Sequence, residues 1–118
     1  MITINRVNDP PFQVNLDDWK ILAQSPGVSA FNIYNKSDNI FVCVRKHRDG
    51  RIIIYQQKII YDPDEQYTKS KVIRNGVYLS EKYRMDIIVQ EMQKFGEQLN
   101  YPEYIIQSWI NELPPEVV

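Results

Sequence analysis

The sequence has little of the chemistry on which most enzymes depend. Its 118 residues include one cysteine, Cys43, and one histidine, His47. One cysteine cannot form an intrachain disulfide, which fits a reducing cytoplasm. One histidine cannot supply the usual ligand set of a zinc or iron site. The sequence also lacks a glycine-rich phosphate loop, a GxSxG turn, a CxxC pair and an HExxH helix. We therefore expect a protein that is not an enzyme, with no catalytic, cofactor-binding or metal-binding residues.

Excess charge and long apolar runs are also missing. The formal net charge is −1, so no overall field would draw the chain to nucleic acid or to anionic lipid. The longest apolar runs, RIIIYQQKIIY and DIIV, are far shorter than the roughly 20 residues that span a bilayer. The start, MITINRVNDPP, has no apolar core of a signal peptide. We expect a cytoplasmic protein that makes no membrane contact.

The composition is otherwise that of a globular protein. Apolar residues make up 43% and charged residues 25% of the sequence, both close to the usual values. The length predicts one domain that covers residues 1–118. Isoleucine, asparagine, lysine and tyrosine, which have AT-rich codons, are abundant, so we expect a bacterial or phage source.

The clearest structural signal is Asp49-Gly50. It lies between two β-branched, aromatic-rich runs, IFVCVRKH (40–47) and IIIYQQKIIY (52–61), and predicts a hairpin with a two-residue type I′ turn. This turn places Arg48 opposite Arg51, and side chains alternate along each strand. The expected core face carries Ile40, Val42, Val44, Ile53, Tyr55 and Ile59. The expected second face, part apolar and part cationic, carries Phe41, Cys43, Arg45, His47, Ile52, Ile54, Gln56 and Lys58.

Shorter signals divide the rest of the first half. Residues 1–7 alternate as a strand does. Residues 15–27, NLDDWKILAQSPG, predict a helix that Asn15 caps and Pro26-Gly27 end. A strand over 28–34 and a break over 35–39 follow.

The second half predicts a loop, a hairpin and two helices. Residues 62–66 form an acidic loop, and 67–79 suggest a second hairpin that turns at Asn75-Gly76, although an ordered loop over 66–79 is the alternative. A helix over 79–100 has Ser80 as its cap and Asn100 at its end. A last helix follows Pro102 and ends at Pro114-Pro115.

This order predicts an α+β fold. We expect an antiparallel sheet of about four to six strands built from hairpins, with one short N-terminal helix and two C-terminal helices packed on one face.

Three groups of residues invite a catalytic or metal-binding interpretation, and each has a simpler one. His47 and Asp49 are two residues apart across a turn, so we favour an exposed strand histidine. Cys43 and His47 are separated by about 13 Å of strand, so we favour a buried structural thiol. Asp62, Asp64 and Glu65 lack the spacing of a calcium loop, so we favour a solvated turn.

Apolar surface beyond one core is the remaining positive feature. The helix over 101–113 is apolar on a wide arc, and Phe41, Ile52 and Ile54 lie on the second hairpin face. Either this surface forms an interface with a partner or a second copy, or the two C-terminal helices cover one sheet face and each other.

We therefore hypothesise a small binding or regulatory module that acts through a protein–protein interface, as inhibitors, immunity factors, chaperones and accessory subunits do. The partner is a protein of unknown identity, with a homodimer as a further expectation. The expected polar contacts are Arg45, His47, Arg48, Arg51 and Lys58, and the expected apolar anchors are Phe41, Ile54 and Trp109.

The alternative is a nucleic-acid or nucleotide-binding protein that uses basic hairpins 45–51 and 69–74. Its expected contacts are Lys46, Lys69, Lys71 and Arg74. Aromatic residues among the cations would stack on bases, and two adjacent hairpins would make one sheet edge positive. The balanced total charge favours the protein interface.

Overall fold

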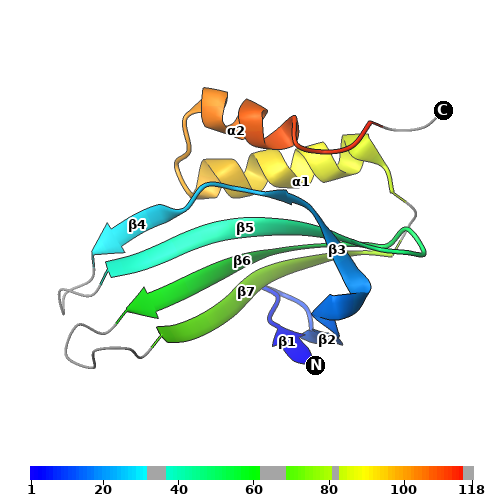
Figure 1. The fold of residues 1–118 in the computed structure, drawn as a ribbon, viewed down its shortest axis with the longest axis horizontal. Helices are drawn as coiled ribbons and strands as arrows, with labels where there is room; N and C mark the ends of the chain where they lie inside the picture. Colours follow the sequence, from blue (N-terminus) through cyan, green and yellow to red (C-terminus); the bar gives the residue numbers. More distant parts are fainter. Residues whose placement is uncertain (32–36, 62–68, 81–82, 116–118) are drawn as a thin grey trace.

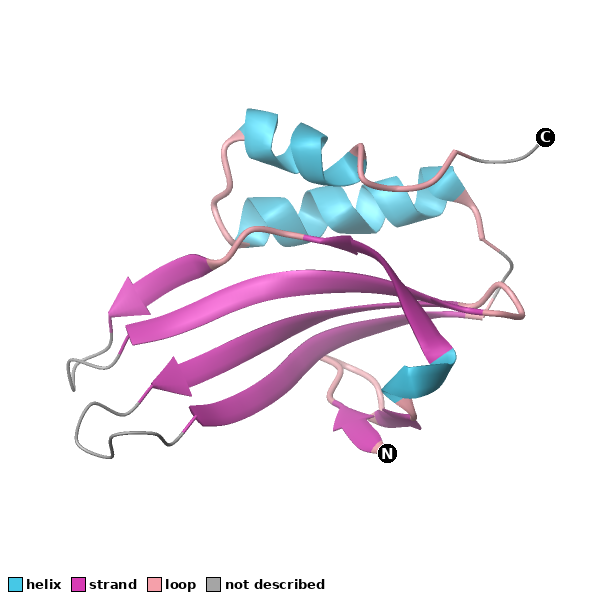
Figure 2. Ribbon diagram, in the orientation of Figure 1, coloured by secondary structure: helices cyan, strands magenta, loops and turns pink. Residues whose placement is uncertain are grey.

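The computed structural model describes residues 1–31, 37–61, 69–80 and 83–115. Its elements are β1 (Ile2–Ile4), β2 (Phe12–Val14), the 3-10 turn η1 (Leu16–Asp18), β3 (Trp19–Gln24), β4 (Val28–Phe31), β5 (Ser37–His47), β6 (Ile52–Tyr61), β7 (Lys69–Leu79), α1 (Met85–Gln98) and α2 (Glu103–Ile110). Both helices lie on one side of a curved sheet, and the β1–β2 hairpin lies on the other (Figures 1 and 2). The α+β class, the antiparallel sheet and the two C-terminal helices on one face are confirmed. No helix within the described ranges is long and apolar enough to cross a membrane.

The main sheet has the order β3-β5-β6-β7, and every pair is antiparallel. β4 also pairs with β5 and continues β3 along the same edge. Pro26 interrupts this edge because it has no N–H to donate. Ser25 bridges the interruption, since its N–H donates to the Val42 carbonyl at 2.9 Å and its Oγ accepts the Val42 N–H at 2.8 Å. The sheet is therefore four strands wide, with an outer strand in two pieces.

The helix predicted for residues 15–27 is wrong. Asn15 does accept the Asp17 N–H at 3.2 Å, as a cap would, but only the single turn η1 follows before β3 begins. A register shift between Ile21 and Ala23 changes which face the side chains of β3 meet. Trp19 is buried on the β1–β2 side and Ala23 on the helix side. A single helix face could not bury both residues against opposite faces of the sheet, which pairing with β5 achieves.

The β5–β6 hairpin is confirmed, but its predicted turn is wrong. The Gly50 N–H donates to the His47 carbonyl and the His47 N–H donates to the Arg51 carbonyl, both at 2.9 Å. Gly50 has a φ of 102°, which is typical of a three-residue loop that ends in a glycine bulge. This loop shifts the register by one residue, so that Val44 pairs with Ile54 rather than with Tyr55.

The shift reverses the faces predicted for β6, because a slip of one residue moves every side chain to the other side of the sheet. Ile52 and Ile54 lie on the helix side with Val44, and Ile53 and Tyr55 lie on the opposite side. The core and mixed faces were therefore wrong for β6.

The second hairpin predicted over 67–79 is also wrong within the described part of that range. β7 is one strand, and Asn75-Gly76 forms a bulge where the pairing with β6 shifts between Ile54 and Gln56. Asn75 has a φ of 55°, and its Nδ2 donates to Gln56 Oε1 at 2.9 Å. The acidic loop 62–66 lies outside the described residues. The break over 35–39 is wrong for 37–39, which belong to β5, and 32–36 lie outside the described residues.

Helix α1 begins later than predicted. The helix starts at Met85, and the residue at its N-cap position is Arg84, whose side chain makes no capping hydrogen bond. The prediction that Ser80 caps this helix is therefore wrong. The physical reason is that Leu79 still pairs with Ile52 in the sheet. At the other end Asn100 has a φ of 58° and its N–H donates to the Glu97 carbonyl at 3.1 Å, which confirms the predicted end.

Two apolar clusters lie on the two faces of the sheet. The helix-side cluster contains Ala23, Val42, Val44, Ile52, Ile54, Ile88, Met92, Phe95, Trp109 and Leu113. The hairpin-side cluster contains Ile4, Val14, Trp19, Cys43, Ile53 and Tyr55. The two C-terminal helices cover one face of the sheet, which was one of the two interpretations left open by the sequence. The β1–β2 hairpin covers part of the other face, which the sequence did not indicate.

Candidate binding surface at the hairpin tip

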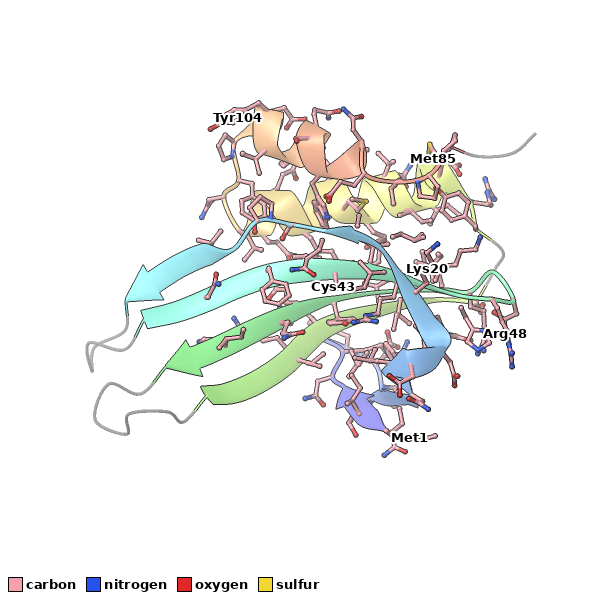
Figure 3. The ribbon with its side chains drawn as sticks, in the orientation of Figure 1. Met1, Lys20, Cys43, Arg48, Met85 and Tyr104 are labelled. Atoms are coloured by element: carbon pink, nitrogen blue, oxygen red, sulfur yellow. The ribbon has the colours of Figure 1, made fainter. Side chains whose placement is uncertain are left out.

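The β5–β6 turn, η1 and the N-terminal hairpin meet at one end of the sheet. Trp19 pairs with His47 across β3 and β5, which brings the start of β3 beside the turn. In Figure 3 Arg48 and Lys20 lie at this end, with Met1 below them. We call the group of Trp19, His47, Asp49, Arg51 and Tyr78 the tip cluster.

Arg51 is the most constrained cation of the tip cluster. Its Nε donates to Asp49 Oδ2 at 2.7 Å, and its Nη1 donates to the Tyr78 hydroxyl at 3.3 Å. Its guanidinium carbon lies 5.2 Å from the centroid of the Trp19 ring, within the range of a cation–π contact. The side chain is still 36% exposed. Arg51 therefore carries a guanidinium that three neighbouring side chains hold in place and that is still partly exposed at the surface.

The carboxyl of Asp49 is charged in this arrangement. Partial desolvation raises its pKa, but hydrogen bonds from the backbone N–H and the guanidinium of Arg51 outweigh that effect and bring the pKa below the usual value. The hydrogen bond with Tyr78, opposed by desolvation and aided by Asp49, raises the pKa of Arg51. Both members of the pair are ionised at neutral pH.

His47 is half-buried, with its side chain 15% exposed, rather than exposed as predicted. Its ring meets that of Trp19 edge-on at a centroid distance of 5.0 Å. Its Nδ1 lies 3.3 Å from the Asp49 N–H and 3.1 Å from Asp49 Oδ1. The Asp49 N–H donates to this nitrogen. The turn thus orients His47 through Asp49, although they are only two residues apart.

Cys43 and Arg45 pack and form hydrogen bonds within the protein on this side of the sheet. Cys43 is 2% exposed, which confirms the buried thiol. Arg45 Nε donates to the Tyr55 hydroxyl at 2.8 Å, and Nη1 donates to the Trp19 carbonyl at 2.9 Å. Burial, followed by the neighbouring Cys43, raises the pKa of Tyr55 to about 12. Arg45 therefore fastens β3 to β5 and β6 instead of facing a partner.

The other residues expected at the interface are dispersed. Ile54 is 0% and Trp109 2% exposed, both in the helix-side cluster, so neither is available as a surface anchor. Phe41 is half-buried against the hairpin-side cluster. Lys58 is half-buried further along β6, and Arg48 is exposed in the turn. Of the expected set, only His47, Arg48 and Arg51 lie together.

The two basic segments of the nucleic-acid alternative lie at opposite ends of the sheet. Ile52 pairs with Leu79 and Tyr61 pairs with Lys69, so roughly 30 Å of strand separates the β5–β6 turn from Lys69. Lys46 belongs to the turn end, where its Nζ lies 5.2 Å from the centroid of the Tyr83 ring. Within the described residues, the two basic segments therefore do not form the adjacent hairpins that would have made one positive edge.

The backbone of Lys71 lies at the same end of β7 as Lys69. The side chains of Lys69 and Lys71 are not among those that the structure describes. Arg74 pairs with Gln56 in mid-strand, and its Nε is buried without a hydrogen-bond partner among the described atoms. Arg74 is thus partly enclosed in the sheet layer.

Two hollows flank His47. The aromatic hollow, of about 310 Å³, is lined by Phe12, Val14, Trp19, Arg51 and Tyr78 among others. The charged hollow, of about 430 Å³, is lined by Asp17, Asp18, Lys20, Lys46 and Arg48 among others. The sequence did not point to Trp19, Tyr78 or the two aspartates, because they come from segments that were assigned to a helix and a second hairpin. They meet through strand pairing, Trp19 with His47 and Tyr78 with Ile53, which no local pattern in the sequence indicates.

Within the parts of the chain that the structure describes, no three histidine, cysteine, aspartate or glutamate side chains are grouped closely enough to hold a metal ion. Comparison with known proteins finds no matching family model, no matching curated protein and no matching solved structure. The tip cluster and the two hollows are therefore the features that bear on function.

Proposed function

We propose that the chain is a cytoplasmic binding or regulatory module, acting without catalysis, that contacts a protein partner through the aromatic hollow. The observation that carries the proposal is the placement of Arg51, which Asp49 and Tyr78 hold over the ring of Trp19. Arginine, tryptophan and tyrosine are the residues most enriched in the few contacts that dominate protein interfaces.

The rigidity of this arrangement supports the same conclusion. A side chain that is already fixed loses little conformational entropy when a partner binds, so more of its contact energy appears as affinity. Phe12 and Val14 add apolar lining beside Arg51. The aromatic hollow is therefore suited to a partner side chain that combines an apolar stem with a carboxylate. An inhibitor, immunity, chaperone or accessory-subunit role would use such a contact.

Affinity purification from the lysate of the source cell tests this proposal, with bound material identified by mass spectrometry at low and high salt. The test variant is Arg51→Ala. Its matched control is Arg48→Ala. This change removes an exposed guanidinium from the same turn, one that makes no hydrogen bond or ion pair among the described residues. We expect one defined protein to be retained at high salt by the wild type and by Arg48→Ala, and to be lost with Arg51→Ala.

Two results would contradict the proposal. If Arg51→Ala retains the same proteins as the wild type while its melting temperature is unchanged, the aromatic hollow is not the contact. If the retained material is sensitive to nuclease and is lost at high salt, phosphate contacts are responsible, and the nucleic-acid alternative replaces the protein partner.

A further inference from the structure

The charged hollow holds like charges in direct opposition. Lys20 pairs with Lys46 across β3 and β5, so both side chains rise from the same face of the sheet. Like charges directly opposite each other in a sheet are unfavourable. The ammonium group of Lys46 lies over the ring of Tyr83, in a cation–π contact, whereas Lys20 is exposed. Arg48 extends from the adjacent turn and adds a third cation to the same hollow.

Two carboxylates line the other side of the charged hollow. Asp17 and Asp18 belong to η1 and are exposed. Neither forms an ion pair with Lys20, Lys46 or Arg48 within the described ranges, although all five line the same hollow. The surface therefore displays an acidic and a basic half, side by side, whose charges are not neutralised by each other.

This pattern restricts the occupant. A purely acidic segment would be repelled by Asp17 and Asp18, and a purely basic one by Lys20 and Arg48. A partner that matches this pattern presents both signs in the reverse order. A second copy does so when the twofold axis runs between the acidic and the basic half, because the same patch then faces itself with its halves exchanged. The net charge of −1 means that two copies do not repel each other strongly.

We propose that two copies of the chain associate through the charged hollow, with Asp17 and Asp18 of each copy against Lys20 and Arg48 of the other. Leu22 and Pro114 also line the hollow and would add apolar contact. The aromatic hollow lies on the other side of His47; Asp18 lines both hollows, whereas Lys20 and Arg48 line only the charged one. Charge reversal at Lys20 and Arg48 therefore separates self-association from the partner binding proposed above.

Sedimentation velocity of the purified full chain over a range of concentrations tests this inference. Two charge-reversed variants are needed, Asp17→Lys/Asp18→Lys and Lys20→Glu/Arg48→Glu. We expect the wild type to form a dimer that weakens as salt rises, because the contact is electrostatic. Each variant alone should dimerise at least about tenfold more weakly, since like charges then meet across the axis. An equimolar mixture of the two variants should form a 1:1 heterodimer.

The mixture is the decisive sample, because only complementary contact at this patch predicts that two defective variants rescue each other. The control is Asp9→Lys, a reversal at an exposed aspartate outside the hollow, which should dimerise as the wild type does. A wild type that stays monomeric at every concentration would overturn the proposal and leave the hollow to another ligand. Variants that dimerise normally, or a mixture of folded variants that stays monomeric, would overturn it equally.

Discussion

Gly76 donates its backbone N–H to the carbonyl oxygen of Asn5 at 2.7 Å, which joins the N-terminal hairpin to the last strand of the sheet. A Cβ atom at position 76 would lie 2.4 Å from Cγ2 of Ile4, a residue that is completely buried. The bulge at Asn75-Gly76 is therefore the docking point of β1 and β2. Because Phe12 and Val14 line the aromatic hollow, this docking also shapes the proposed binding surface.

Gly76→Ala should lower the free energy of unfolding by about 1–3 kcal/mol, the usual cost of forcing extra volume into a packed site. The added methyl group must displace Ile4 or the backbone of Asn5. Urea denaturation measures the loss, and limited proteolysis should show earlier cleavage within residues 1–15.

Gly27→Ala is the matched control for this experiment. The three atoms nearest to a Cβ there all belong to the side-chain amide of Asn39, which can rotate away. Its loss of stability should be clearly smaller. Equal losses for the two variants, or a stable Gly76→Ala protein with a protected N-terminal segment, would mean that the hairpin is not docked as described.

Ser25→Ala should destabilise the protein by about 1–3 kcal/mol, the cost of leaving a buried donor unpaired. The Ser25 hydroxyl accepts the N–H of Val42 next to Pro26, and Val42 is completely buried. Urea denaturation gives the change in stability, and hydrogen exchange should show faster exchange of the Val42 amide. Ser25→Thr keeps the hydroxyl and should retain most of the protection. Unchanged exchange in the alanine variant would contradict this role.

The hairpin over 40–61 could be predicted from the sequence, but its register could not. Asp49-Gly50 is compatible with a two-residue loop and with a three-residue loop that ends in a glycine bulge. The two loops differ by one residue of register, and that difference exchanges the faces of Ile54 and Tyr55. The local signal identifies the turn, whereas packing of the helices and of β1–β2 on the two faces selects the register.

The candidate site, too, could be predicted only where its residues are close together in the sequence. His47 and Arg51 were found because they stand beside the turn signal, which is local in sequence. Trp19 and Tyr78 come from β3 and β7, and they meet Arg51 only because those strands pair with β5 and β6. The apolar spacing of residues 15–25 fits a helix or a strand. The partner strand, which is distant in sequence, decides between them.

Replacing Ile54 by alanine should impair folding rather than binding. Ile54 is completely buried in the helix-side cluster, and truncation of a buried isoleucine costs about 2–5 kcal/mol. The control is Tyr104→Ala, since Tyr104 is the exposed aromatic residue of α2, 72% accessible, and its loss should change stability by less than about 0.5 kcal/mol. Thermal unfolding compares the two. A well-folded Ile54→Ala protein that loses its partner would show instead that Ile54 is an interface anchor.

Tyr55 should make the protein less stable at high pH. Burial, with a smaller contribution from Cys43, raises its pKa to about 12 in the folded state, whereas an unfolded tyrosine has a pKa of about 10. The folded state holds the phenolic proton more tightly, so the stability it contributes is complete below pH 10 and is lost as pH rises from about 10 to 12. That loss should reach about 3 kcal/mol for this group, since each pKa unit corresponds to about 1.4 kcal/mol.

Urea denaturation at a series of pH values between 9 and 11.5 measures this dependence. Tyr55→Phe should be less stable at neutral pH, because Arg45 loses the hydroxyl to which it donates, but its stability should fall less steeply above pH 10. Tyr104→Phe alters an exposed tyrosine and should retain the slope of the wild type. The lower stability at neutral pH reports the lost hydrogen bond, and the shallower slope above pH 10 reports the raised pKa, so this variant measures the two contributions separately. A Tyr55→Phe protein that follows the wild-type slope would mean that the buried phenol does not couple folding to pH.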